Sequence, residues 1–187
     1  MLRVRVVFGG LPGTPALATH YFSGGDTQTN ADNAVSKVGT LWGAIDAQLT
    51  SGLNWATDAD VAIMNTSDGN VTGVLATTPQ TGTGASSSEL LPQLVQGLIV
   101  WRTNQFSGGR RLIGHTFIPG QVETNNTAGT DPSPSSGLQS AVNAALTAYL
   151  TGGTAVPAVW SRKGGVTSGI TSATMRDFWS VLRSRRN

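Results

Sequence analysis

Apolar and polar side chains alternate in several short runs along this chain, which is the pattern of a strand that buries one face. In the first run, Val4, Val6 and Phe8 alternate with two arginines. Together with the run at 94–103, which is apolar on both faces and is typical of a central strand, runs of this kind predict eight strands, at about residues 2–8, 16–22, 59–65, 71–77, 94–103, 111–118, 156–160 and 172–182.

Two longer segments carry apolar residues at three- and four-residue steps, the spacing of an amphipathic helix. They are predicted to be helices at about residues 29–50 and 137–151. Asp26, Thr27 or Thr29 is expected to cap the start of the first helix, because a short polar side chain accepts hydrogen bonds from the free backbone N–H groups there. Trp42 lies on the apolar stripe of this helix and is predicted to be a core residue.

One connection between predicted strands has a distinctive sequence. Asp68 and Gly69 lie between the runs at 59–65 and 71–77. Asp-Gly between two such runs is a strong signal for a two-stranded hairpin, so these strands are predicted to pair.

The order of the elements predicts the fold class. Residues 1–187 show no linker and no internal repeat, so a single domain is expected. Eight strands in adjacent pairs predict a mainly β fold, an antiparallel β-sandwich of the jelly-roll type with the two helices inserted in loops. The same order accommodates an α+β fold with a single sheet and two helices on one face, because strand order cannot be read from one sequence.

The composition indicates a surface that neighbours can cover. Charged residues make up 12% of the chain, about half of the usual share. A surface of neutral polar groups and apolar patches suits close packing against other protein. The formal net charge of +2 is too small to indicate a nucleic-acid-binding protein by itself. No apolar run is long enough for a signal peptide or a membrane span, so no membrane partner is expected.

Side chains that carry out catalysis are sparse in this sequence. There is no cysteine, which excludes disulfides and thiolate chemistry. The two histidines, His20 and His115, lie inside predicted strands, where each is expected to be an ordinary strand residue bonded to a neighbour. There is neither a Gly-x-Ser-x-Gly elbow nor a phosphate-binding loop. The chain is therefore predicted not to be an enzyme and to need no cofactor.

Two carboxylates form a candidate calcium site. Asp58 and Asp60 lie two residues apart at the entry to a predicted strand, a spacing that puts both on one face. If Asp68 or a neighbour completes the site at a subunit interface, the set has the oxygen ligands that calcium prefers. The alternative interpretation is that both are exposed charges that guard the end of a strand.

Basic residues gather at the end of the sequence, where Arg183, Arg185 and Arg186 lie close together. Arginines at a free end can contact the phosphates of a nucleic acid. They can equally form salt bridges between subunits, or keep a hydrophobic strand soluble. These three residues are therefore candidates for contact with nucleic acid or with another subunit.

Several segments, mostly in the second half of the chain, carry a resemblance to a known class of proteins. They are residues 91–103, 108–111, 114–120 and 181–186. These segments resemble small, mostly uncharacterised virion structural proteins of small viruses and bacteriophages. The resemblance implies a single jelly-roll capsid protein located in the virion. Such capsid proteins often carry a basic N-terminal arm, whereas here a strand is predicted from residue 2, so only the basic C-terminus is expected to reach the viral genome.

The leading hypothesis is a capsid protein that assembles with copies of itself into a homo-oligomeric shell. Loops at residues 78–90 and 121–136 are expected to make the lateral contacts. One alternative is a phage head–tail connector or tail protein that forms a ring. Another is a carbohydrate-binding β-sandwich module, in which Trp55 or Trp160 would be an exposed platform for stacking on a sugar.

Overall fold

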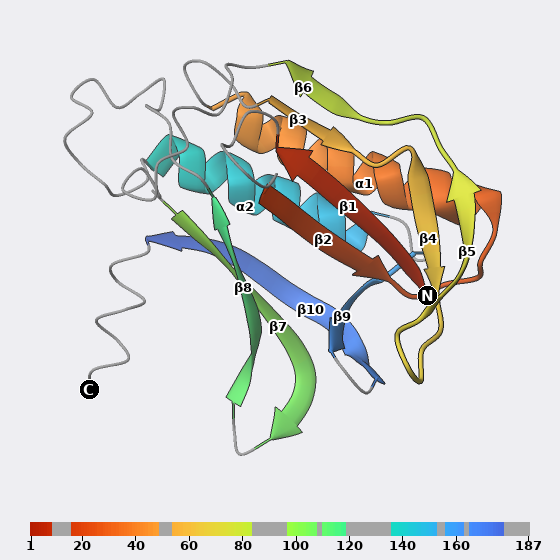
Figure 1. Ribbon diagram of the computed structural model, residues 1–187. Coiled ribbons are helices and arrows are strands. Elements are labelled where there is room, and N and C mark those ends of the chain that lie inside the picture. Colours follow the sequence, from red (N-terminus) through yellow and green to blue (C-terminus); the bar gives the residue numbers. More distant parts are fainter. Residues whose placement is uncertain are drawn as a thin grey trace.

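The computed structural model describes eight stretches of the chain, namely residues 1–8, 16–48, 54–83, 97–107, 110–118, 136–152, 156–162 and 165–177. Their helices and strands are, in order, β1 (Leu2–Phe8), β2 (Ala16–Phe22), α1 (Gln28–Asp46), β3 (Asn54–Thr57), β4 (Asp60–Met64), β5 (Val71–Ala76), β6 (Thr81–Thr83), β7 (Gly97–Ser107), β8 (Arg110–Ile118), α2 (Ser136–Thr151), β9 (Ala158–Arg162) and β10 (Gly165–Asp177). Figure 1 shows how they are arranged in space.

In the described part of the chain, ten strands form one open sheet with antiparallel pairing. The strand order along its main path is β5-β4-β1-β2-β9-β10-β7-β8. The two remaining strands branch from β1, since β3 pairs with the end of β1 and β6 pairs with β3. The fold is therefore α+β, with β5 and β8 at the two ends of the main path.

The predicted jelly-roll sandwich is wrong, and the alternative α+β arrangement is the one observed. The two helices pack against each other and onto the sheet, side by side behind β1 and β2 in Figure 1. One cluster of buried apolar side chains joins strands from both ends of the sheet to both helices. Within this cluster the apolar side chains of the strands pack against helix residues, which stand where a sandwich would have its second sheet.

Burial follows the sequence pattern closely in β1. Leu2, Val4, Val6 and Phe8 are buried, and the side chains between them are only partly covered. Burying such a side chain stabilises the fold by roughly 1.5–3 kcal/mol relative to leaving it in water. Seven residue pairs connect β1 to β2, so the first two strands form a continuous hairpin face beneath α1.

The local signals at α1 and at the β4–β5 turn act as predicted. Thr27 is the N-cap of α1, and its hydroxyl accepts a hydrogen bond from the backbone N–H of Asn30 at 3.3 Å. In the turn, Gly69 has a φ of +75°, which favours glycine. The Asp68 carboxylate accepts from the N–H of Asn70 at 2.9 Å. The predicted Asp-Gly hairpin is confirmed.

Two short strands were absent from the prediction. β3 and β6 are only four and three residues long, and β6 reads Thr-Gly-Thr, which lacks an apolar alternation. They pair so that Trp55 lies opposite Gly82. The missing side chain of Gly82 leaves room for the buried indole of Trp55, because a Cβ atom built there would overlap that ring.

Replacing Gly82 with alanine is expected to destabilise the fold by about 1–3 kcal/mol, the usual effect of overpacking a core. Urea unfolding measures this effect. The matched control is Gly73→Ala in β5, where the added Cβ would meet the Cδ1 atom of Ile63 at 3.4 Å, close to ordinary contact. Equal stabilities of the two variants would show that the Trp55–Gly82 contact is unimportant.

The sheet consists of two strand groups that meet at a narrow junction. The N-terminal group is β1–β6 and lies under α1, whereas the C-terminal group is β7–β10 and contacts α2 through β10. Between the groups, β2 and β9 share two residue pairs, Tyr21 with Val159 and Phe22 with Ala158. We call this junction the seam.

Candidate functional site

A buried histidine lies next to the seam and bonds to both helices. The Nε2 atom of His20 accepts a hydrogen bond from the indole N–H of Trp42 at 3.0 Å. Its Nδ1 atom lies 3.1 Å from the hydroxyl oxygen of Tyr149. Because an indole N–H can only donate, Nε2 carries no proton. The neutral ring therefore has its proton on Nδ1, which donates to the hydroxyl oxygen of Tyr149.

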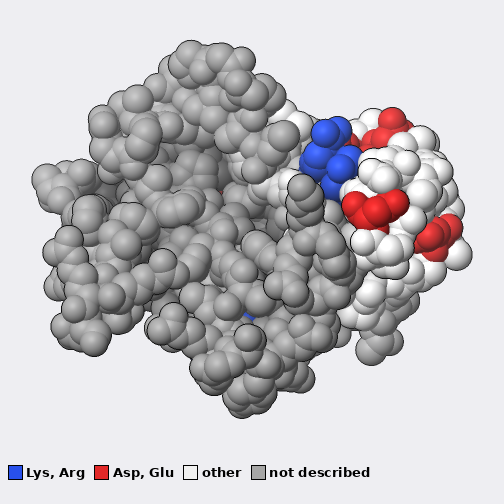
Figure 2. All heavy atoms as spheres, turned by 60° about the horizontal axis from the view of Figure 1, so that its bottom comes forward, with Lys and Arg blue, Asp and Glu red and all other residues white. Residues whose placement is uncertain are grey.

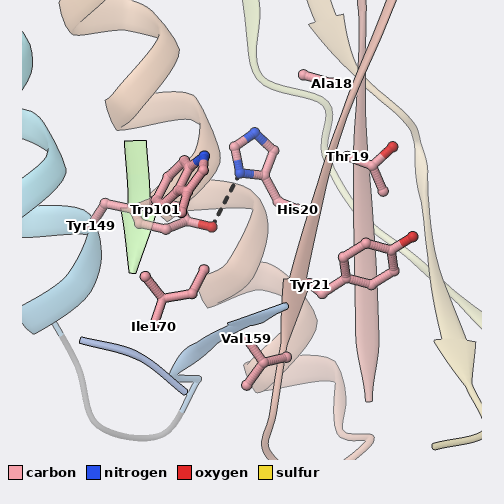
Figure 3. A pocket seen from close by; sticks show the side chains of 8 residues that line it. All are labelled: Ala18, Thr19, His20, Tyr21, Trp101, Tyr149, Val159 and Ile170. Atoms are coloured by element: carbon pink, nitrogen blue, oxygen red, sulfur yellow. Dashed lines mark hydrogen bonds between the residues drawn. The ribbon is translucent and has the colours of Figure 1, made fainter. Parts of the chain in front are cut away.

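Each member of this hydrogen-bonded chain comes from a different element. The alternation of β2 turns His20 toward the helices, Trp42 lies on the buried stripe of α1, and Tyr149 lies near the end of α2. Trp101 of β7 adds a fourth aromatic ring, with its centroid 5.6 Å from that of Tyr149 and 6.5 Å from that of His20. Figure 3 shows the His20 ring facing the Tyr149 hydroxyl, with Trp101 beside it.

A small cavity of about 30 Å³ lies beside this cluster, where β2 separates from β9. Its lining combines the cluster with neighbouring strand residues: Ala18, Thr19, His20, Tyr21, Trp101, Tyr149, Val159 and Ile170. A cavity of this size holds about one ordered water, which needs polar partners such as the Tyr149 hydroxyl. It is too small for a substrate or an organic cofactor.

Burial fixes the charge state of both titratable groups in the cluster. It lowers the pKa of His20 from 6.5 to about 4 and raises the pKa of Tyr149. At neutral pH the imidazole and the phenol are therefore both uncharged. The expectation that His20 is a strand histidine bonded to its neighbours is confirmed, while His115 lies in β8, whose side chains the structure does not describe.

The second candidate site is the outer edge of β5, at one end of the sheet. Figure 1 shows β5 on the outside of the molecule. The backbone N–H of Thr77 donates to the carbonyl of Ala59 at 2.7 Å, which sets the alternation of backbone groups along the strand. The N–H and C=O groups of Val74 then point away from β4. The outward carbonyl of Ala76 accepts from the Gln28 side chain of α1 at 2.8 Å.

The side chains of β5 do nothing to protect this edge. The strand reads Val-Thr-Gly-Val-Leu-Ala and contains neither a charge nor a proline. Val71 and Val74 are 50% and 60% exposed, and they are the large apolar side chains that the described residues leave in solvent. Protein edges are usually blunted by lysine, proline or a covering loop, because a bare edge pairs with other strands. The feature of the sequence that could have identified this edge is the absence of charged residues from 71–76.

The two carboxylates proposed to bind calcium have different environments. Asp58 accepts a hydrogen bond from the guanidinium Nε of Arg5 and forms an ion pair with it. Asp60 is exposed at the start of β4. Within the described stretches, no group of three or more metal-binding side chains is found. Calcium binding at this pair stays a prediction, and the ion pair with Arg5 accounts for Asp58 without it.

The remaining predicted site residues are two tryptophans and three C-terminal arginines. Trp55 is only 3% exposed, so it cannot be a platform for stacking on a sugar. Trp160 lies in β9, but its side chain is outside the described set. Arg183, Arg185 and Arg186 lie outside the described residues altogether. On the face turned forward in Figure 2, basic and acidic side chains of the described part lie next to each other, which gives no extended patch of one sign in that view.

Comparison with known proteins adds no relative. The chain matches no protein-family model, no curated protein and no solved structure. Neither of the two described helices has the length and apolar character needed to cross a membrane.

Proposed function

We propose that this chain is a virion structural protein that assembles with copies of itself into a homo-oligomeric shell, and that β5 makes one of the contacts between copies. The observation that carries the proposal is the uncharged outer edge of β5 at Val71–Val74, with its two exposed valines. The resemblance of residues 91–103, 108–111, 114–120 and 181–186 to virion structural proteins supports the placement in a virion.

Strand pairing explains why a second copy is a suitable occupant of this edge. Two identical edges can pair antiparallel about a two-fold axis, since each supplies the same donors and acceptors to the other. No charge on β5 opposes that approach. The exposed side chains of Val71 and Val74 would then cover apolar surface of the partner and leave water.

One two-fold contact joins two subunits and stops there, so a shell needs at least one further contact. The loops at residues 78–90 and 121–136 were predicted to provide it. Of these, residues 78–83 and residue 136 belong to the described part of the chain. Residues 78–80 are exposed and lie between β5 and β6, next to the proposed β5 contact.

Replacing Val74 with lysine is expected to weaken association between copies by about tenfold or more, roughly 1.4 kcal/mol. The reason is that two like charges would face each other, or lie close together, across a two-fold pairing. Size-exclusion chromatography with light scattering measures the association. The stability of a single copy should change by less than about 0.5 kcal/mol, because the side chain is largely exposed.

The matched control is Ala144→Lys, which adds the same charge at an exposed position of α2. This variant should assemble like the unmodified chain. If both lysine variants assemble normally, β5 is not a contact between copies. If both lose assembly equally, added charge alone is responsible and the edge has no special role.

A further inference from the structure

Beside the apolar core that both strand groups share, the hydrogen bonds found across the seam in the described residues lie toward one end of β2, apart from those of His20. Next to the two β2–β9 residue pairs, the backbone N–H of Ser23 donates to the carbonyl of Pro157 at 2.9 Å. The ammonium group of Lys37 on α1 donates to the carbonyl of Val156 at 3.1 Å. Beyond His20, the cavity takes the place of a paired strand. The hydrogen-bonded chain of side chains Trp42–His20–Tyr149 therefore forms the polar connection between the two sides of the seam at the cavity.

The two hydrogen bonds of His20 can be satisfied together only when the ring is neutral. A second proton would have to bind Nε2, the atom that accepts from the Trp42 indole at 3.0 Å. Two N–H groups would then point at each other, and neither can accept. Protonation therefore breaks one hydrogen bond and places a charge on a buried ring.

None of the described groups found against His20 in its hydrogen bonds, its ring contacts and the cavity lining carries a negative charge. Each helix or strand around His20 places one side chain near its ring. On the near side these are Val4 of β1, Trp42 of α1, Tyr149 of α2 and Trp101 of β7, and across the cavity they are Val159 of β9 and Ile170 of β10. Of these groups only the phenol of Tyr149 is titratable, and burial raises its pKa, so it stays neutral in acid. Lys37 also lies at the seam, where its ammonium group donates to the carbonyl of Val156.

We propose that the Trp42–His20–Tyr149 chain is an acid-sensitive latch, which holds the N-terminal and C-terminal strand groups together at the seam and opens when the imidazole takes up a second proton. The latch lies within one copy of the chain, so it does not depend on assembly. Because burial lowers the pKa of His20 to about 4, the latch is closed at neutral pH and opens as the pH falls toward that value.

Distances between spin labels across the seam test the proposal directly. The chain contains no cysteine, so two introduced cysteines are the only labelling sites. Thr66→Cys, in the turn between β4 and β5, and Ser172→Cys, in β10, are exposed positions on opposite sides of the seam. Thr66→Cys with Ser36→Cys, exposed on α1, forms a control pair on the N-terminal side. Between about pH 7 and pH 4, the cross-seam distances should lengthen and broaden while the control pair stays unchanged.

The two histidines provide matched variants for this experiment. His20→Gln keeps one acceptor and one donor but cannot take up a proton, so the acid-induced change in the cross-seam pair should disappear. His115→Gln should leave the change intact. Cross-seam distances that stay constant from about pH 7 to pH 4, or that change to the same extent in His20→Gln, would overturn the latch.

A further measurement keeps the test decisive if His20→Gln does not fold. In His115→Gln, His20 is the single histidine, so proton NMR can follow its ring alone. The midpoint of that titration should coincide with the midpoint of the cross-seam distance change. Midpoints that are well separated would show that another group opens the seam, and the proposal would be wrong.

Discussion

Replacing Trp42 with alanine is expected to lower the free energy of unfolding by about 4 kcal/mol, within the range of roughly 3–5 kcal/mol for a buried tryptophan. The side chain is 1% exposed and belongs to the core cluster that joins the helices to the sheet. Its ring meets that of Phe8 edge to face, with centroids 4.8 Å apart. The substitution also leaves Nε2 of His20 without its donor. A domain of ordinary stability, about 5–15 kcal/mol, would lose much of it.

Urea unfolding followed by far-ultraviolet circular dichroism measures this loss. Trp42→Phe is the matched control, since it keeps an aromatic ring in the core and removes the indole N–H. This variant should lose less, with about 1–3 kcal/mol coming from the unsatisfied acceptor of His20. A Trp42→Ala variant that unfolds at the same urea concentration as the unmodified chain would show that α1 does not depend on this residue for packing.

Acidification is expected to lower the free energy of unfolding by up to about 3 kcal/mol through His20 alone, since one pKa unit corresponds to about 1.4 kcal/mol. The pKa of the histidine is 6.5 without burial and about 4 in the folded chain, because burial disfavours the charged ring. The unfolded chain therefore binds the proton first as the pH falls. This contribution to stability is fully present above about pH 6.5, is lost progressively between about pH 6.5 and pH 4, and changes no further below that.

Urea unfolding at a series of pH values measures this dependence. Carboxylates also titrate in this range, so the informative quantity is the difference in free energy of unfolding between His20→Gln and the unmodified chain. That difference should change with pH between about 6.5 and 4, whereas the corresponding difference for His115→Gln should change little. Parallel pH profiles for the unmodified chain and His20→Gln would contradict the assignment of a neutral, buried imidazole.

The local patterns in the sequence predicted most of the elements. The strands expected at residues 2–8 and 16–22 match β1 and β2, and the helix expected at 137–151 matches α2 closely. Such patterns succeed because they record which side chains face the core. Boundaries were less accurate. The helix expected at 29–50 ends at Asp46 in α1, and the strand expected at 172–182 begins at Gly165 in β10. Residues 49–50 and 178–182 of these two predictions lie outside the described residues.

The fold class was wrong because alternation shows that one face of a strand is buried but does not show what covers it. In β1 the buried face of Val4 and Val6 fits a second sheet as well as it fits α1. Pairing adds a second difficulty. β1 pairs on one side with β2, the next strand in the sequence, and on the other side with β3 and β4, which follow α1. No local signal specifies the pairing with β3 and β4.

The candidate sites show the same limit. His20 was predicted to bond to a neighbour, but the partners Trp42 and Tyr149 are 22 and 129 residues away in the sequence. Only the packing of α1 and α2 onto β2 brings them together. Likewise, residues 71–76 were predicted to be a strand and carry no charge, but their position at the end of the sheet depends on the strand order. The sequence shows which residue types are present, but it does not show which of them lie close together in the fold.

The assembly state of the purified chain is the direct test of self-assembly. Light scattering after size exclusion, followed by negative-stain electron microscopy, determines the mass and the shape of the particles. Closed particles of defined diameter are the predicted result, and they should be lost in Val74→Lys but kept in Ala144→Lys. A chain that stays monomeric across salt concentration and pH would contradict self-assembly as its function.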